Sequence, residues 1–279
     1  MKFPIFHGFI ASEIGSAKPL EVMKTAFGLA DRLDAQLSVA IGALQISVRT
    51  ILSSTTVEGL ISDENKRSAD SAAAAREQIV GLARNSGLIV HTEILKGDLG
   101  SITGRCANRA RVHGLIFAEA GIPGALLGGA LIESLIFESG RPVIVVPNGF
   151  SSDISLEHVL VAWDGSAVAA RALWDSLPLL RLATTIEIVT VTGEKELNDV
   201  PAANALAGML TFLGKKVSVT VLAYDGGTAA SLIKQHAAKS GAGLVVQGAY
   251  GRSRWRELIL GGVTREMLHD CTIPVLMSH

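Results

Sequence analysis

Short apolar runs and polar segments alternate along the second half of the chain. Apolar or β-branched runs, typical of buried strands, occupy residues 158–163, 185–191, 217–224, 243–248 and 273–278. Segments with the apolar spacing of helices lie between them, at 166–183, 228–241 and 264–270. Strands separated by helices run parallel, because each connection must cross the sheet. The pattern therefore predicts an α/β fold with a doubly wound, five-stranded parallel sheet.

The first half repeats this order of elements. It shows strand-like runs at 3–11, 36–44 and 89–95 and helix-like segments at 19–33 and 65–87. A constant shift aligns Gly97 with Gly227 and Ser101 with Ser231, and each half ends in a proline followed by an apolar run. We therefore predict two Rossmann-like domains, residues 1–149 and 150–279.

The last strand of each predicted domain is short and strongly apolar. These strands lie at Val143–Val146 and Val275–Met277. Each would form an exposed sheet edge if its domain stood alone, and an exposed edge pairs readily with another strand. The two strands can therefore pair with each other within one chain. The low content of charged residues also suggests a homodimer.

Composition and charge argue against a nucleic-acid-binding protein and against a membrane-spanning protein. Charged residues make up 18% of the chain and the net charge is −1, with no basic block that would attract a nucleic acid. The longest uncharged apolar stretch lies between Glu119 and Glu133 and is too short to span a membrane. The amino terminus lacks the pattern of a signal peptide. We expect a cytoplasmic protein, with Cys106 and Cys271 as buried thiols rather than a disulfide.

Candidate chemistry gathers where strands of the second half end. Asp164 follows the first strand in "VLVAWDGSA", Val191 ends the second, and Gly248, Gly251, Gly261 and Gly262 follow the fourth. Ligands of open α/β sheets bind outside the carboxyl ends of the strands. Glycine lets the backbone approach a ligand closely, and a helix that begins near Gly261 would add free N–H groups. The glycine spacing alone is equally compatible with a simple connecting loop.

The second half resembles a universal stress protein domain. The resemblance lies in "VLVAWDGSA" and in the spacing Gly248-x-x-Gly251, nine residues, Gly261. Because the elements repeat in the first half, the whole chain is similar to a tandem member of that family. The resemblance implies that the last strands of the two domains are adjacent and antiparallel, around a pseudo-two-fold axis. It also implies ATP as ligand, with Mg²⁺ or Mn²⁺ at its phosphates. It places the adenine near Val191 and the ribose near Asp164. The residues implied at the phosphates are Gly248, Ala249, Gly251, Arg252, Gly261, Gly262, Val263 and Thr264.

Two departures from the family pattern affect this expectation. Gly262 stands where the family has Ser or Thr, which removes one hydroxyl from the phosphate site. In the first half, Ala118 replaces the first glycine and Pro123 removes a backbone donor. We therefore expect one nucleotide site, in the second half.

Other residues suggest no further chemistry. His236 and His269 form no metal-binding pattern of the His-x-x-x-His kind or with acidic residues. His158 stands alone at a strand end, and we interpret it as structural or solvated. The chain has no P-loop lysine. The leading hypothesis is a stress-response protein in which adenine-nucleotide binding acts as a switch or modulates an unknown protein partner. The alternatives are a slow ATPase and a nucleotide-free scaffold.

Overall fold

The computed structural model describes residues 6–10, 19–47, 55–120, 126–193, 200–224, 226–249, 266–268 and 272–279. The chain forms two units that interleave along the sequence. One comprises residues 1–141 and 148–153, and the other comprises residues 142–147 and 154–279. The domain boundary that we placed between residues 149 and 150 stays a prediction.

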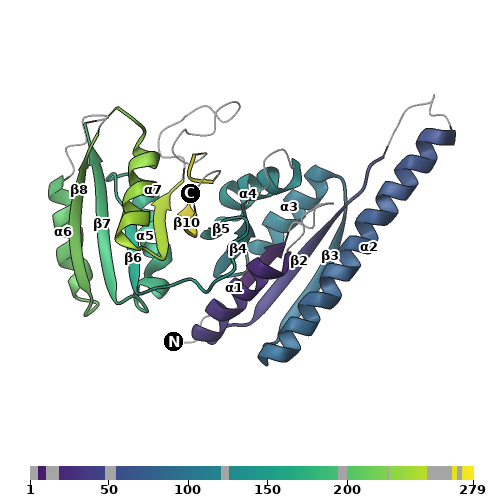
Figure 1. Cartoon of the computed structure of the whole chain (residues 1–279), viewed down its shortest axis with the longest axis horizontal. Coiled ribbons are helices and arrows are strands. Elements are labelled where there is room, and N and C mark those ends of the chain that lie inside the picture. The colour runs from purple at the N-terminus through teal and green to yellow at the C-terminus, as the bar shows by residue number, and fades with distance from the viewer. Residues whose placement is uncertain are drawn as a thin grey trace. The chain divides into compact units, whose positions relative to one another are not determined.

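The first unit alternates strands and helices, as Figure 1 shows. Its elements are β1 (Phe6–Ile10), α1 (Pro19–Arg32), β2 (Leu37–Leu44), α2 (Thr55–Ser86), β3 (Val90–Gly97), α3 (Leu99–Ala110), β4 (Leu115–Glu119) and α4 (Leu126–Glu138). The strands follow the order β3-β2-β1-β4, and β1 runs parallel to both β2 and β4. The order reverses between β1 and β4, so this sheet is doubly wound.

The second unit begins with β5 (Val143–Val146) and continues after residue 154. Its remaining elements are β6 (His158–Ala162), α5 (Ala167–Leu180), β7 (Thr185–Thr192), α6 (Val200–Thr211), β8 (Lys216–Ala223), α7 (Ala229–Ser240), β9 (Leu244–Gly248) and β10 (Val275–Ser278). The strand order is β5-β10-β9-β6-β7-β8. The sheet is parallel except at β5, which confirms the predicted α/β class.

The strand β5 lies in the second unit because it pairs with β10. The pairing is antiparallel, with Ile144 opposite Leu276 and Val143 opposite Met277. All four residues of β5 and all four of β10 are buried. The prediction that these two short apolar strands lie side by side and antiparallel within one chain is therefore confirmed.

Helix starts show the repeat at the level of single residues. Asp98 caps α3 by accepting a hydrogen bond from the Ser101 backbone N–H. Thr228 caps α7 in the same way, accepting from Ser231, whose side chain also bonds back to Thr228. Each cap satisfies one N–H group that has no partner inside its helix. The aligned polar residues of the two halves thus begin equivalent helices.

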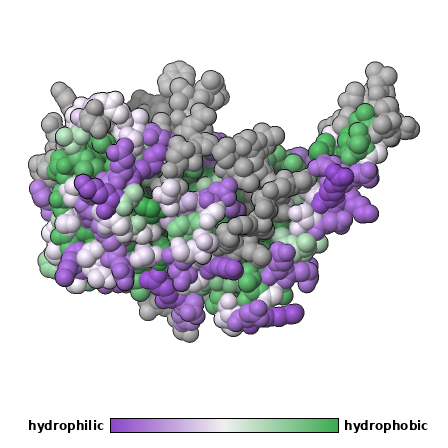
Figure 2. All heavy atoms as spheres, in the orientation of Figure 1, coloured by the Kyte–Doolittle hydropathy of each residue, from purple (hydrophilic) through white to green (hydrophobic). Residues whose placement is uncertain are grey.

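Helix α2 is longer than its sequence pattern indicated. It begins at Thr55, ten residues before the predicted start at Asn65. The side chain of Asn65 fixes the helix to the end of β2, donating to the Ile46 carbonyl at 3.0 Å and accepting from the Ile46 N–H at 2.7 Å. The turns that precede Asn65 extend past the strands in Figure 1. Figure 2 shows apolar side chains on this part of the helix. Leu60, in these turns, is 66% exposed.

Candidate functional site

The carboxyl ends of β6 and β9 meet at the point where the strand order of the second unit reverses. Chain order runs from β6 to β7 and β8 on one side, and then returns to β9 and β10 on the other. Open α/β sheets bind their ligands at such a crevice. Asp164 follows β6, Val191 lies near the end of β7, and Gly248 ends β9. The structure therefore brings these three predicted residues together at the carboxyl ends of neighbouring strands.

Asp164 also shapes the turn that connects β6 to α5. Its Oδ1 accepts a hydrogen bond from the Ser166 backbone N–H at 3.0 Å. Gly165 has φ of +71°, in the left-handed region. Ser166 then caps α5 by accepting from the Ala169 N–H at 3.2 Å. One carboxylate oxygen of Asp164 thus holds the turn, and a carboxylate has a second oxygen that can accept a hydrogen bond from a ribose hydroxyl.

Gly248 permits a close approach between β9 and the first turn of α5. A Cβ atom added at Gly248 would lie 2.6 Å from the Ala169 nitrogen and 2.6 Å from the Val168 carbonyl carbon. No side chain fits at this distance. The end of β9 and the N-terminus of α5 therefore meet backbone to backbone, and the free N–H groups and positive dipole end of the helix favour an anion at this edge.

Ala249 is fixed at the start of the glycine-rich segment. Its N–H donates to the Ser278 carbonyl at 2.8 Å, and its own carbonyl lies 3.0 Å from His279 Nδ1. Six predicted phosphate-site residues lie outside the described residues: Gly251, Arg252, Gly261, Gly262, Val263 and Thr264. The next described residue is Glu266, which contacts α7 through the Thr228 hydroxyl at 2.7 Å and Lys234 Nζ at 3.4 Å.

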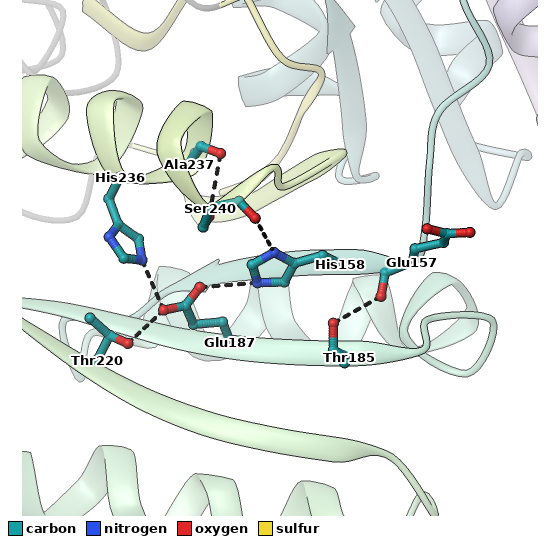
Figure 3. A network of polar contacts seen from close by, with 8 residues as sticks. All are labelled: Glu157, His158, Thr185, Glu187, Thr220, His236, Ala237 and Ser240. Atoms are coloured by element: carbon teal, nitrogen blue, oxygen red, sulfur yellow. Dashed lines mark hydrogen bonds and ion pairs between the residues drawn. The ribbon is translucent and has the colours of Figure 1, made fainter.

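A buried carboxylate lies between two histidines in the same unit, as Figure 3 shows. His158 Nε2 lies 3.0 Å from Glu187 Oε2, and His236 Nε2 lies 2.8 Å from Glu187 Oε1. The Thr220 hydroxyl also donates to Oε1, and His158 Nδ1 lies 3.2 Å from the Ser240 carbonyl oxygen. His158 is structural, as interpreted from the sequence. The carboxylate partner that it shares with His236 was missed, because Glu187 lies on a different strand.

The environment of Glu187 keeps its carboxylate ionised. Burial raises the pKa of the carboxyl, but the hydrogen bonds from Thr220 and His236 and the charges of the two imidazoles together bring the pKa below its usual value. The cluster joins β6, β7, β8 and α7 near the amino-terminal part of β7. It lies away from the carboxyl ends of the strands, so we assign it to the anchoring of α7 rather than to ligand binding.

The first unit contains a cavity of about 410 Å³ between β2, β3 and α3. Its lining includes Glu93 and Arg109, which form an ion pair with each other. Nearby, Cys106 is buried and free, and burial raises the pKa of its thiol to about 12. The expectation of a buried thiol is confirmed for Cys106, while Cys271 lies outside the described residues. No predicted site residue lines this cavity.

Two further properties concern the described part of the chain. Within it, no group of three or more His, Cys, Asp or Glu side chains is arranged to hold a metal ion. None of its helices combines the length and apolar character needed to cross a membrane.

Comparison with known proteins identifies the family. Residues 155–279 match the model of the universal stress protein family. A universal stress protein of Synechocystis sp. is 30% identical over 216 residues, which cover 73% of this chain and 66% of that protein. The chain thus spans slightly less than two thirds of this relative's length.

Solved structures show the same fold over nearly the full length. A universal stress protein from Archaeoglobus fulgidus DSM 4304 has a TM-score of 0.70 at 17% identity and covers 98% of this chain and 97% of its own. A functionally unknown protein from Pseudomonas aeruginosa PAO1 has a TM-score of 0.58 at 16% identity, with 98% and 92% covered. With its matched second half and its Rossmann-like α/β fold, the chain belongs to the universal stress protein family.

Proposed function

We propose that the second unit binds an adenine nucleotide, ATP, and that binding acts as a switch in a stress response. One observation carries the proposal: Asp164, Val191 and Gly248 lie at the carboxyl ends of three adjacent strands around the reversal point of the sheet, next to the N-terminus of α5. The packing of Gly248 against the first turn of α5 supports it, because it brings the end of β9 to a helix start, whose N–H groups and dipole favour an anion.

Each described residue has a role in this proposal. Val191 contacts the adenine, and the Asp164 carboxylate accepts from the ribose. The phosphates bind to backbone N–H groups of the segment that starts at Gly248 and Ala249, beyond the Ala249 N–H, which already donates to the Ser278 carbonyl. Gly251, Arg252, Gly261, Gly262, Val263 and Thr264 complete the phosphate site in the proposal. Mg²⁺ or Mn²⁺ would enter together with the phosphates and neutralise their charge.

Isothermal titration of the full chain with MgATP tests the proposal. We expect binding by the wild type and at least tenfold weaker binding by Asp164→Asn, which removes the charge but keeps an oxygen that can accept from Ser166. Asp98→Ala provides a matched control, because it removes an aspartate from a helix start in the first unit. The absence of binding heat and of any nucleotide-dependent thermal shift in the wild type would favour the scaffold alternative.

The glycine segment has its own test. Gly251→Val or Gly261→Val should weaken ATP binding by about 1–3 kcal/mol, through blocked approach and lost glycine-type conformations. The same change at Gly121 or Gly129, in the first half, should leave ATP affinity unchanged. Folded Gly251 and Gly261 variants that bind like the wild type would reject the phosphate role. Phosphate release that disappears in Asp164→Ala would instead support a slow ATPase.

A further inference from the structure

Three residues at the carboxyl ends of neighbouring strands carry buried polar atoms that have no hydrogen-bond partner among the described residues. They are Trp163 after β6, Gln247 in β9 and Ser278 in β10. The only other described residue with such an atom is Asp175, on α5. Buried polar groups are normally paired, so unpaired ones that cluster at a candidate site call for a physical reason.

Of the three residues, Gln247 has the most buried polar atoms without a partner among the described residues. Its side chain is 4% exposed, and both its Nε2 and its Oε1 are without a partner among the described residues. A carboxamide offers two donor hydrogens and an acceptor oxygen, so burial without partners destabilises the fold. The preceding residues of β9, Leu244, Val245 and Val246, are apolar and fully buried. An apolar side chain of similar size would fit this pattern better than an amide.

Strand register shows which way Gln247 faces. Leu160 pairs with both Glu187 and Val245, so these three side chains share one face of the sheet. Glu187 contacts His236 of α7, so this face is the one that α7 covers. Gln247 lies two residues beyond Val245 and therefore projects to the same face. Gly248 faces the opposite side, toward α5.

The chain that follows the glycine-rich segment returns to the face onto which Gln247 projects. Glu266 is fixed against α7 through Thr228 and Lys234. Gln247 thus lies directly before Gly248, at the reversal point of the sheet, on the side where residues 266–268 pack. Ser278 pairs with Gly248, so its hydroxyl, which has no partner among the described residues, lies at the same end of the strands but on the opposite face, toward α5.

We propose that Gln247 is a positioning residue of the nucleotide site whose carboxamide gains its hydrogen-bond partners only in the nucleotide-bound state. This inference rests on the proposed function. Because the buried amide has no partner among the described residues, the unliganded protein carries a desolvation cost in this inference, and ATP binding relieves it. The amide then adds to affinity and to discrimination, because a ligand that leaves it unpaired binds less tightly.

The test compares the full-length wild type with Gln247→Met and Gln247→Leu, which keep similar size without the amide. We expect both variants, without nucleotide, to melt at or above the wild-type temperature. In titrations with MgATP we expect their affinity to fall at least tenfold and the nucleotide-induced rise in melting temperature to shrink. Gln235→Met makes the same chemical change at an exposed position of α7 and should bind ATP like the wild type.

Each contrary outcome has a distinct meaning. If both variants without nucleotide melt several degrees below the wild type, the amide already has partners within the chain and the inference is overturned. If the wild type binds ATP and the variants bind it equally well, the inference fails while the proposed function stands. If the wild type binds no ATP, the proposed function and this inference fail together.

Discussion

Gly248 has no room for a side chain, because an added Cβ would lie 2.6 Å from backbone atoms of α5. We expect Gly248→Ala to lower the free energy of unfolding by about 1–3 kcal/mol, since α5 or β9 must move. Gly208 on α6 is the control: nothing lies within 4 Å of its added Cβ, and alanine is the better helix former. Gly208→Ala should raise the free energy of unfolding by up to about 1 kcal/mol. Urea unfolding that shows equal effects at both positions would contradict the close packing.

Glu187 predicts how the stability of the second unit depends on pH. The pKa of its carboxyl is lower in the folded protein than in the unfolded chain, where it is about 4.3. A group with a lowered folded pKa stabilises the fold fully above its unfolded pKa, and this contribution is lost as pH falls through the folded pKa. The stabilisation by Glu187 is therefore complete at pH 7 and declines below about pH 4.3.

The substitution Glu187→Gln tests this dependence. We expect it to lower the free energy of unfolding at pH 7 by about 1–3 kcal/mol, because charged hydrogen bonds to a buried carboxylate are lost. The difference from the wild type should shrink as pH falls below about 4.3. Glu157→Gln, which removes an exposed carboxylate beside His158, should show neither effect. Chemical unfolding at several pH values gives both quantities, and a constant difference across pH would contradict the assignment.

At the scale of elements, the pairing of β5 with β10 is open to a direct test. Cysteines introduced by Ile144→Cys and Leu276→Cys, in a chain that carries Cys106→Ser and Cys271→Ser, occupy register partners. We expect efficient crosslinking within one chain. Val143→Cys with Val275→Cys is the control, because Val143 pairs with Met277 and Val275 pairs with Val145. Crosslinks found only between chains would show that the strands pair across molecules in solution.

Two helices show where the apolar pattern of the sequence did not predict an element or its start. The apolar spacing within α2 becomes regular only from Ser68 onward, where Ser68, Ala72, Ala75, Ile79 and Ala83 are buried. The first turns of this helix bury no residue between Val57 and Arg67, so no periodic pattern marked their start. Helix α6 was likewise not identified individually from the sequence.

At the scale of the whole molecule, the two halves differ where the nucleotide site is proposed. Ala118 is buried at the end of β4, at the position where the second half has a glycine. We therefore expect one ATP per chain. Titration of the full chain with MgATP measures this number directly. A stoichiometry near two would show that the first half binds nucleotide despite Ala118 and Pro123, and the single-site proposal would then be wrong.

The sequence by itself determined the α/β class and the parallel strands, and together with the family resemblance it predicted the meeting of β5 with β10. It also placed Asp164, Val191 and Gly248 at carboxyl ends of strands, because the period of apolar residues reports local backbone conformation and the parallel direction follows from the crossovers.

Tertiary structure alone decided the contacts between side chains of different elements. His158, Glu187 and His236 meet because strand register and the packing of α7 bring them together. That the buried amide of Gln247 has no partner among the described residues is visible only once burial and hydrogen bonds are known. Local periodicity carries no information on such contacts, since each depends on the relative placement of elements that are distant in the chain.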